Sequence, residues 1–154
     1  MEEMKMLNKE LIYLDVDGKD SEELLSKLSD VLYEKGYVEE SFKQAILNRE
    51  KEFPTGLPTL GVKVALPHTD PKHVIKPAIL VSTLRKPIKF KEMGSGINDV
   101  EVEMVFMLAV KKPEYQVKLL QKLINIFSKE DVLTSLKECK DAVSIYNILE
   151  KEIY

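Results

Sequence analysis

The feature that most constrains the fold is the apolar run Met104 to Val110, the longest in the sequence. It is far shorter than the ~20 apolar residues that a membrane-spanning helix needs, so no segment is expected to cross a bilayer. Extended back to Val102, its near-continuous apolar character is typical of a strand that is covered on both faces. The sequence therefore predicts a sheet with other elements packed on both of its sides.

Hydrophobic spacing predicts further elements in an order that suits a layered α/β domain. Strands are expected at 9–16, 60–66, 78–84 and 102–110. Helices are expected from Asp20 or Ser21 to Gly36, over 39–52 before Pro54, at 117–127, at 131–139, and after Asp141. Val117, Leu120, Ile124 and Phe127 follow helical spacing and are predicted to belong to the core. With 154 residues, 44% of them hydrophobic, the chain is expected to form one domain over 1–154.

Composition argues against several classes of function. The net charge is -3, from 23 basic and 26 acidic residues spread along the chain, so no basic stripe is present for nucleic acid. Residues 1–5 lack the pattern of a signal peptide, and a cytoplasmic location is expected. Cys139 is the only cysteine, and His68 and His73 are the only histidines. No disulfide, metal site or other cofactor is therefore expected.

The stretch from Asn48 to Asp70 is the most informative for chemistry. His68 follows a predicted strand end and Pro67, which fixes its own backbone and biases Leu66 toward an extended shape. Crevices at the carboxyl ends of strands are common ligand sites in α/β folds, and a neutral imidazole is a nucleophile near neutral pH. His68 is therefore a candidate nucleophile. A turn or capping role is the alternative that the residues alone leave open.

Three more residues in this stretch suit a phosphoryl group. Arg49, near the end of a predicted helix, offers paired donors that match phosphate oxygens. Thr55 supplies a hydroxyl, and Gly56 supplies a backbone that can approach a ligand closely. Phosphoryl transfer needs positioning and charge stabilisation, which these residues and His68 can provide. The alternatives are that Arg49 is half of a surface ion pair and that the Thr-Gly pair is a plain turn.

These residues belong to a longer pattern: Arg49-Glu50, then Pro54-Thr55-Gly56-Leu57, then Gly61-Val62-Lys63-Val64-Ala65-Leu66-Pro67-His68. The pattern resembles the signature of the fructose/mannitol-type (type 2) IIA proteins of the bacterial phosphotransferase system. The order of expected strands and helices also fits, so the resemblance covers nearly the whole chain. The details of 54–58 and 66–70 are most similar to the galactitol-specific branch.

The resemblance implies a mixed β-sheet flanked by helices on both faces. It also implies that His68 is the phosphorylated nucleophile, that Arg49 stabilises the phosphoryl group, and that Thr55 and Gly56 line its pocket. The implied donor is phospho-HPr, the implied acceptor is the cognate IIB component of a membrane permease, and no cofactor is needed. Many members carry a second histidine near the reactive one. Here Gln116 occupies that place; it can hydrogen-bond a phosphoryl oxygen but cannot carry a proton.

The expected function is a cytoplasmic phosphoryl carrier of a phosphoenolpyruvate-dependent sugar phosphotransferase system, a phosphotransferase serving uptake of a sugar or a galactitol-like polyol. Two partners must take turns at His68, so a shallow depression ringed by apolar residues is expected, with Pro54, Leu57 and Leu66 as candidates. The alternative is a regulatory IIA-like protein that senses the phosphorylation state of the system and binds other proteins, because a fold and motif constrain function only partly.

Overall fold

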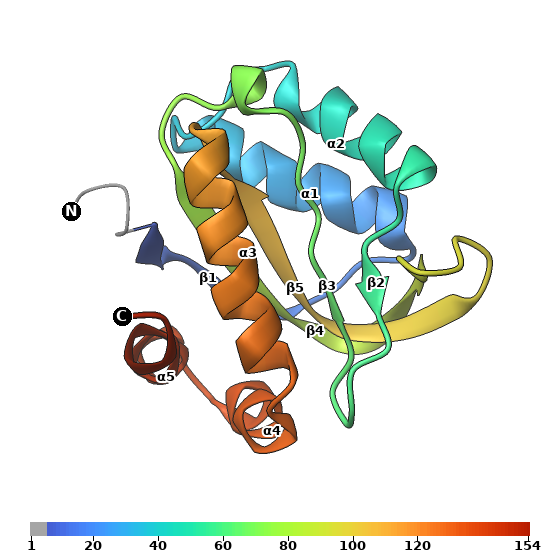
Figure 1. The fold of residues 1–154 in the computed structure, drawn as a ribbon, viewed down its shortest axis with the longest axis vertical. Helices are drawn as coiled ribbons and strands as arrows, with labels where there is room; N and C mark the ends of the chain where they lie inside the picture. The colour runs from blue at the N-terminus through green and yellow to red at the C-terminus, as the bar shows by residue number, and fades with distance from the viewer. Residues whose placement is uncertain (1–5) are drawn as a thin grey trace.

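The computed structural model describes residues 6–154, apart from the side chains of Pro113, Tyr115 and Gln116. In this part of the chain a five-stranded sheet lies between helices (Figure 1). The elements in chain order are β1 (Leu7–Val16), α1 (Ser21–Glu34), α2 (Phe42–Glu52), β2 (Gly56–Leu57), β3 (Val64–Ala65), the 3-10 helix η2 (Pro71–His73), β4 (Ala78–Lys91), β5 (Asp99–Ala109), α3 (Pro113–Phe127), α4 (Glu130–Glu138) and α5 (Ala142–Ile153). None of the helices described is both long enough and apolar enough to span a membrane.

The sheet is mixed, with the strand order β1-β4-β5-β3-β2. β1 runs parallel to β4 and β3 runs parallel to β5, whereas the pairs β4–β5 and β2–β3 are antiparallel. Because β3 and β5 are parallel, their carboxyl ends lie at the same end of the sheet. The chain that follows β3 and the helix α3 that follows β5 therefore start side by side. A backbone bond of 2.9 Å from the Leu108 N–H to the Pro67 carbonyl joins the two exits.

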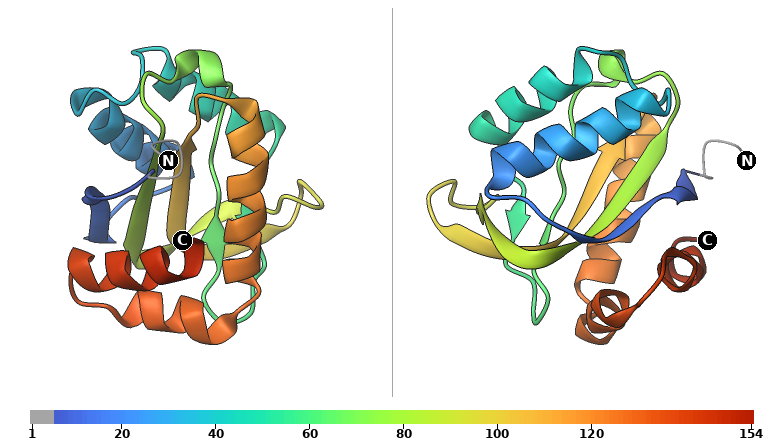
Figure 2. Two further views of the ribbon diagram at one scale, coloured as in Figure 1. Left: turned by 60° about the vertical axis from the view of Figure 1, so that its left-hand side comes forward. Right: turned by 180° about the vertical axis from the view of Figure 1, so that it is seen from behind.

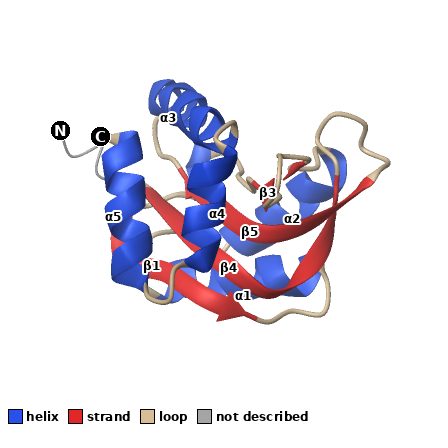
Figure 3. Cartoon of the chain, turned by 90° about the horizontal axis from the view of Figure 1, so that it is seen from below, coloured by secondary structure: helices blue, strands red, loops and turns tan. Residues whose placement is uncertain are grey.

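Strand β5 divides its side chains between two cores, one on each face of the sheet. One set packs with α3, α4 and α5, and the other packs with α1 and α2 (Figures 2 and 3). The first set is Met104, Phe106 and Leu108, and the second is Val105, Met107 and Ala109, each at most 1% exposed. The prediction of a strand covered on both faces is confirmed.

Local signals set several helix ends where they were predicted. The Asp20 carboxylate accepts a 2.8 Å bond from the Glu23 N–H and caps α1. Asp141 caps α5 in the same way through the Ser144 N–H. Gly36, just past the end of α1, has φ +83°, the left-handed backbone that glycine adopts without steric cost.

Two predicted elements are shorter in the structure. The helix expected over 39–52 begins only at Phe42, because Glu39 donates its N–H to the His73 carbonyl and so belongs to a bridge between loops. The strand expected over 60–66 is reduced to Val64–Ala65. Gly61 there has φ +72° and Leu60 is 70% exposed, so the chain turns before it joins the sheet.

The β4–β5 hairpin is longer than predicted. β4 continues to Lys91 and β5 begins at Asp99, so the loop between them is short. The pairing register shifts between Thr83 and Ile88, and Pro87 lies in that irregularity, where a residue without an N–H is tolerated. Because Pro87 and the charged residues around it interrupt the hydrophobic pattern, the second half of β4 was not predicted.

The predicted core face of α3 was partly wrong. Val117 and Ile124 are each 57% exposed, whereas Leu123 is fully buried. Leu119, Ile126 and Phe127 are buried with it. The helical spacing was correct, but α3 is apolar around more than half of its circumference, so spacing alone could not identify the inward face.

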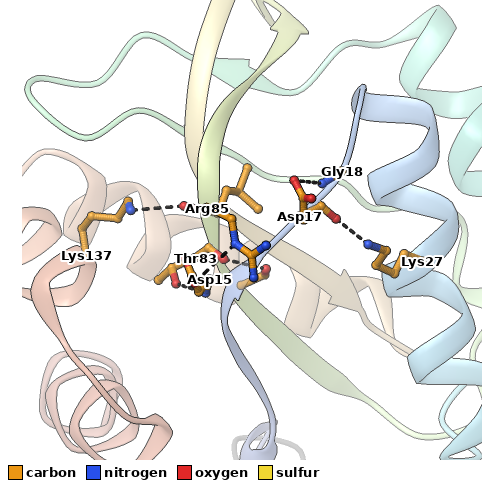
Figure 4. A network of polar contacts seen from close by, with 9 residues as sticks. Asp15, Asp17, Gly18, Lys27, Thr83, Arg85 and Lys137 are labelled. Atoms are coloured by element: carbon orange, nitrogen blue, oxygen red, sulfur yellow. Dashed lines mark hydrogen bonds and ion pairs between the residues drawn. The ribbon is translucent and has the colours of Figure 1, made fainter.

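At the edge of the sheet formed by β1, a polar network holds the backbone where the chain leaves that strand (Figure 4). Asp15 has φ +58°, unusual for a residue with a side chain. Its N–H donates to the Thr83 hydroxyl at 2.9 Å, and its carboxylate lies 3.5 Å from Arg85 Nε. Lys137 on α4 donates to the Leu84 carbonyl at 3.2 Å. These contacts join β1, β4 and α4 where the chain turns toward α1.

Candidate functional site

Three of the predicted site residues come together where α2, the β2–β3 edge and α3 meet. Arg49, Thr55 and His68 all line one cavity of about 320 Å³. In Figure 1 the chain after β3 passes between α3 and the end of α2. The other lining residues are Phe53, Pro54, Leu57, Leu66, Met93, Leu120 and Ile124. The wall is thus mostly apolar, and it includes all three residues predicted to ring the site.

His68 is held in one tautomer by the backbone. Its Nδ1 lies 2.8 Å from the Leu66 carbonyl oxygen. A carbonyl can only accept, so Nδ1 carries the hydrogen and the neutral ring keeps its lone pair on Nε2. Burial lowers the pKa of His68 below its ordinary value of 6.5, and the Arg49 charge lowers it further, although the bond to Leu66 opposes both. The imidazole is therefore neutral and nucleophilic at neutral pH.

Arg49 contributes a positive charge to the same cavity. Its Nη1 lies 3.8 Å from the Asp70 carboxylate, and its guanidinium lies 4.7 Å from the centre of the Phe53 ring. Its Nε is buried and has no acceptor among the residues that the structure describes. The ion pair is long and exposed, so it is weak. Arg49 therefore keeps donors that an anion can use.

Thr55 is buried and is held by the carboxylate of Glu50. The Thr55 N–H donates to one Glu50 oxygen and its hydroxyl donates to the other, both at 2.8 Å. Burial raises the pKa of Glu50 to about 7, although the two Thr55 bonds oppose the shift. Glu50 formed part of the sequence pattern, but the charged run Glu50-Lys51-Glu52 predicts a solvated face, so its bonds to Thr55 were not expected from the sequence.

Gly56 lies in strand β2, next to the cavity residues Thr55 and Leu57. It pairs with Ala65 in the β2–β3 ladder, and it is not among the residues that line the cavity. A Cβ at this position would lie 2.7 Å from the Lys91 carbonyl oxygen. The close approach that glycine permits here is therefore to strand β4. The Gln116 prediction lies outside the side chains that the structure describes.

Four cavity residues were missed or misread. Phe53 and Met93 carried no sequence signal for this site, whereas Leu120 and Ile124 were assigned to the core as part of the α3 stripe. The useful signal was an apolar stripe too wide for one buried face. The excess width of the stripe indicates a second apolar contact surface, and here that surface borders His68.

His73 lies in a separate, polar cavity of about 230 Å³ on the other side of Arg49. Its Nδ1 is 2.7 Å from the Ser41 hydroxyl, and Asp70 and Lys72 line the same cavity. Among the described residues, no group of histidine, cysteine, aspartate and glutamate is arranged to hold a metal ion.

Comparison with known proteins identifies the family of this chain. Residues 5–152 match the family described as phosphoenolpyruvate-dependent sugar phosphotransferase system, EIIA 2. The chain belongs to this family. It is an EIIA component, a phosphoryl carrier of that system, as the sequence pattern predicted.

Individual relatives of this EIIA chain include both transport components and a regulator. The galactitol-specific EIIA component of Escherichia coli (strain K12) is 32% identical over 117 residues, which is 76% of this chain and 77% of that protein. The transcriptional regulator ManR of Bacillus subtilis (strain 168) is 32% identical over 101 residues, 66% of this chain but 14% of the regulator.

A solved structure also shares the fold. It is the complex of mannitol enzyme IIA with phosphorylated mannitol enzyme IIB from Escherichia coli. The matching chain has a TM-score of 0.74 and 24% identity, and the match covers 94% of this EIIA chain and 96% of that one. The predicted fold class, an α/β domain with a mixed sheet flanked by helices, is confirmed.

Proposed function

We propose that this EIIA chain carries its phosphoryl group on Nε2 of His68. The observation that carries the proposal is the 2.8 Å bond from Nδ1 to the Leu66 carbonyl, within a cavity that Arg49 also lines. That bond leaves Nε2 as the one nitrogen with a free lone pair. Phosphorylation of Nε2 makes the ring cationic, and the same bond stabilises the cationic ring because the hydrogen on Nδ1 becomes more acidic.

The proposed transfer is a direct displacement at phosphorus. Nε2 of His68 attacks in line, the new N–P bond forms as the bond to the donor breaks, and the electron pair of that bond returns to the donor. Arg49 interacts with the phosphoryl oxygens and offsets their charge. The second transfer reverses these roles: His68 becomes the leaving group. No redox change occurs in either step.

The proposed partners are phospho-HPr as donor and a cognate IIB component of a membrane permease as acceptor, both meeting the chain in the cytoplasm. The apolar wall of Leu57, Leu120 and Ile124 suits a transient protein contact around the histidine. The proposed cargo of the permease is a galactitol-like polyol. This finer assignment is supported by the galactitol-specific relative and by the 54–58 and 66–70 details of the sequence.

The test is incubation of the pure protein with enzyme I, HPr and labelled phosphoenolpyruvate. Acid-labile, base-stable label is expected on the wild type and not on His68→Ala, with circular dichroism as the check that both are folded. Proton–phosphorus correlation by NMR then assigns the label to Nε2 or Nδ1. Label on folded His68→Ala, or on Nδ1, would overturn the proposal.

A regulatory function is the second candidate, favoured by the match to the regulator ManR. The two functions differ in what the phosphorylated chain does next. Incubation of the labelled protein with the IIB component of a galactitol permease decides between them. Loss of label to the IIB cysteine within seconds to minutes supports transport, whereas label that stays on EIIA in the presence of folded IIB favours regulation.

A further inference from the structure

A continuous series of hydrogen bonds connects Glu50 on α2 to the reactive ring. The Glu50 carboxylate accepts the Thr55 N–H at 2.8 Å. The Thr55 carbonyl accepts the Leu66 N–H at 3.2 Å, and the Leu66 carbonyl accepts Nδ1–H of His68 at 2.8 Å. Each residue that donates one bond accepts the next through its carbonyl, so the position of Glu50 helps to set the position of His68.

The Thr55 hydroxyl presents a conflict within this series. Thr55 lines the cavity with His68, yet its hydroxyl proton is donated to Glu50 at 2.8 Å. An ionised carboxylate accepts but cannot donate, and the oxygens of a phosphoryl group also need donors. An ionised Glu50 and a phosphoryl group on His68 therefore compete for one proton of Thr55.

We propose that Glu50 is a positioning residue that takes up a proton when His68 is loaded, so that Thr55 redirects its hydroxyl from Glu50 to a phosphoryl oxygen. Protonated Glu50 donates to the Thr55 oxygen through one carboxyl oxygen and still accepts the Thr55 N–H through the other. Both existing heavy-atom contacts are kept, and only hydrogens move. The inference rests on the proposed role of His68.

The surroundings of Glu50 allow its carboxylate to take up a proton at a small cost in free energy near neutral pH. Burial already raises the pKa of Glu50 to about 7. Arg49 and His68 line the same cavity as Thr55, and the backbones of Lys91 and Glu92 near the end of β4 lie beside Gly56. Arg49 is paired with Asp70 and Lys91 with Asp99. New negative charge on a phosphoryl group next to Thr55 raises the pKa of Glu50 further, because like charges disfavour ionisation.

The proton balance of the step is simple. The proton on Glu50 comes from solvent, the Thr55 proton stays on its own oxygen and changes its acceptor, and His68 keeps its Nδ1 proton. Loading therefore consumes up to one proton per phosphoryl group when the pH lies between the pKa of Glu50 in the unloaded protein and its higher pKa in the loaded protein. Unloading to the next acceptor returns that proton to water.

The first experiment measures the equilibrium between phospho-HPr and the EIIA chain from pH 6 to pH 9. Glu50→Gln mimics the protonated acid, because its amide donates to Thr55 and its carbonyl accepts the N–H. Above pH 7 the wild-type loading constant is expected to fall up to tenfold per pH unit relative to Glu50→Gln. Glu50→Ala should load roughly tenfold less than Glu50→Gln at every pH, because Thr55 loses its anchor.

Two further variants separate this role from a merely structural one. Glu34→Gln removes the same charge from an exposed position at the end of α1 and should follow the wild-type profile. In Thr55→Val the hydroxyl is absent, and adding Glu50→Gln should then bring no gain above pH 7. Parallel pH profiles for wild type and Glu50→Gln would overturn the inference.

A titration of the Glu50 carboxyl carbon by NMR tests the same point without relying on variants. The midpoint is expected to rise by about one pH unit or more when His68 is phosphorylated. An unchanged midpoint in a loaded protein defeats the inference and leaves the proposed function intact. A wild-type protein that takes no label, or a folded His68→Ala that does, defeats the proposed function itself.

Discussion

Two histidines on the same connection between β3 and β4 have different surroundings. His68 places Nδ1 against a backbone carbonyl in a mostly apolar cavity, and His73 places Nδ1 against the Ser41 hydroxyl in a polar one. A carbonyl only accepts, so the Leu66 carbonyl fixes the tautomer of His68 with the hydrogen on Nδ1 and leaves the lone pair on Nε2. A hydroxyl both donates and accepts, so the Ser41 hydroxyl does not determine which nitrogen of His73 carries the hydrogen. A ring nitrogen is thus kept available for covalent chemistry when the partner of the other nitrogen has a single hydrogen-bonding role.

The largest expected effect comes from removing each ring in turn. His68→Ala should abolish phosphoryl acceptance, because His68 is the only histidine that lines the apolar cavity among the side chains described. His73→Ala should retain acceptance within about twofold, since its ring lies outside that cavity. Label uptake from phospho-HPr under identical conditions measures both. A His73→Ala protein that is folded but accepts no phosphoryl group would show that both histidines are needed.

Arg49 lines both the His68 cavity and the His73 cavity. Arg49→Met keeps much of the apolar side chain over Phe53 but removes the charge. Its rate of phosphoryl acceptance should fall about 10²-fold, the usual loss for one charge-stabilising donor. Stability should change little, because the Asp70 pair is exposed. A quenched time course of label uptake measures the rate of acceptance, and a thermal melt measures the stability. A large drop in melting temperature with an unchanged rate would make Arg49 structural.

The difference between the two histidines was only partly readable from the sequence. The motif ending at Pro67-His68 singled out His68 as the candidate nucleophile, and the run at β5 predicted a sheet covered on both faces. The tautomer was not readable, because it depends on the Leu66 carbonyl turning back toward the ring that follows it. Such a contact depends on backbone geometry, which no residue type specifies.

Contacts that depend on how the chain folds back on itself could not be predicted from the sequence for a similar reason. Glu50 and Thr55 are close in the chain, yet the twofold bond between them exists only because α2 ends and the chain reverses into β2. Gly56 was predicted to let its backbone approach a ligand, and the structure adds a close approach to the Lys91 carbonyl on β4 that the sequence did not indicate. Local propensity located the helix caps at Asp20 and Asp141, whereas tertiary packing decided these other roles.

Helix α3 gives the His68 cavity an apolar wall that the His73 cavity lacks. Ile124, 57% exposed, should act through partner docking, so Ile124→Ala should raise the KM for phospho-HPr roughly three- to tenfold. Its free energy of unfolding should change by less than about 1 kcal/mol. The adjacent control is Leu123→Ala, which empties a fully buried site and should cost about 2–5 kcal/mol. Urea melts and initial rates separate the two; equal losses of stability would mean that α3 has no free face.

The smallest expected effect is a shift along the pH axis, and it tests why His68 stays neutral. Burial and Arg49 lower the pKa of His68, so acceptance should hold as the pH falls to 6.5 and decline only below it, where the ring gains a proton and loses its lone pair. In Arg49→Met the repelling charge is gone, the pKa of His68 rises, and the acid limb should move to higher pH by less than about one unit. NMR titration of the ring carbon gives the pKa directly in both proteins. Because the bond to the Leu66 carbonyl is the same in both, an acid limb that moves to lower pH would show that Arg49 does not act on the ring by charge, and the contrast with His73 would then rest on the tautomer alone.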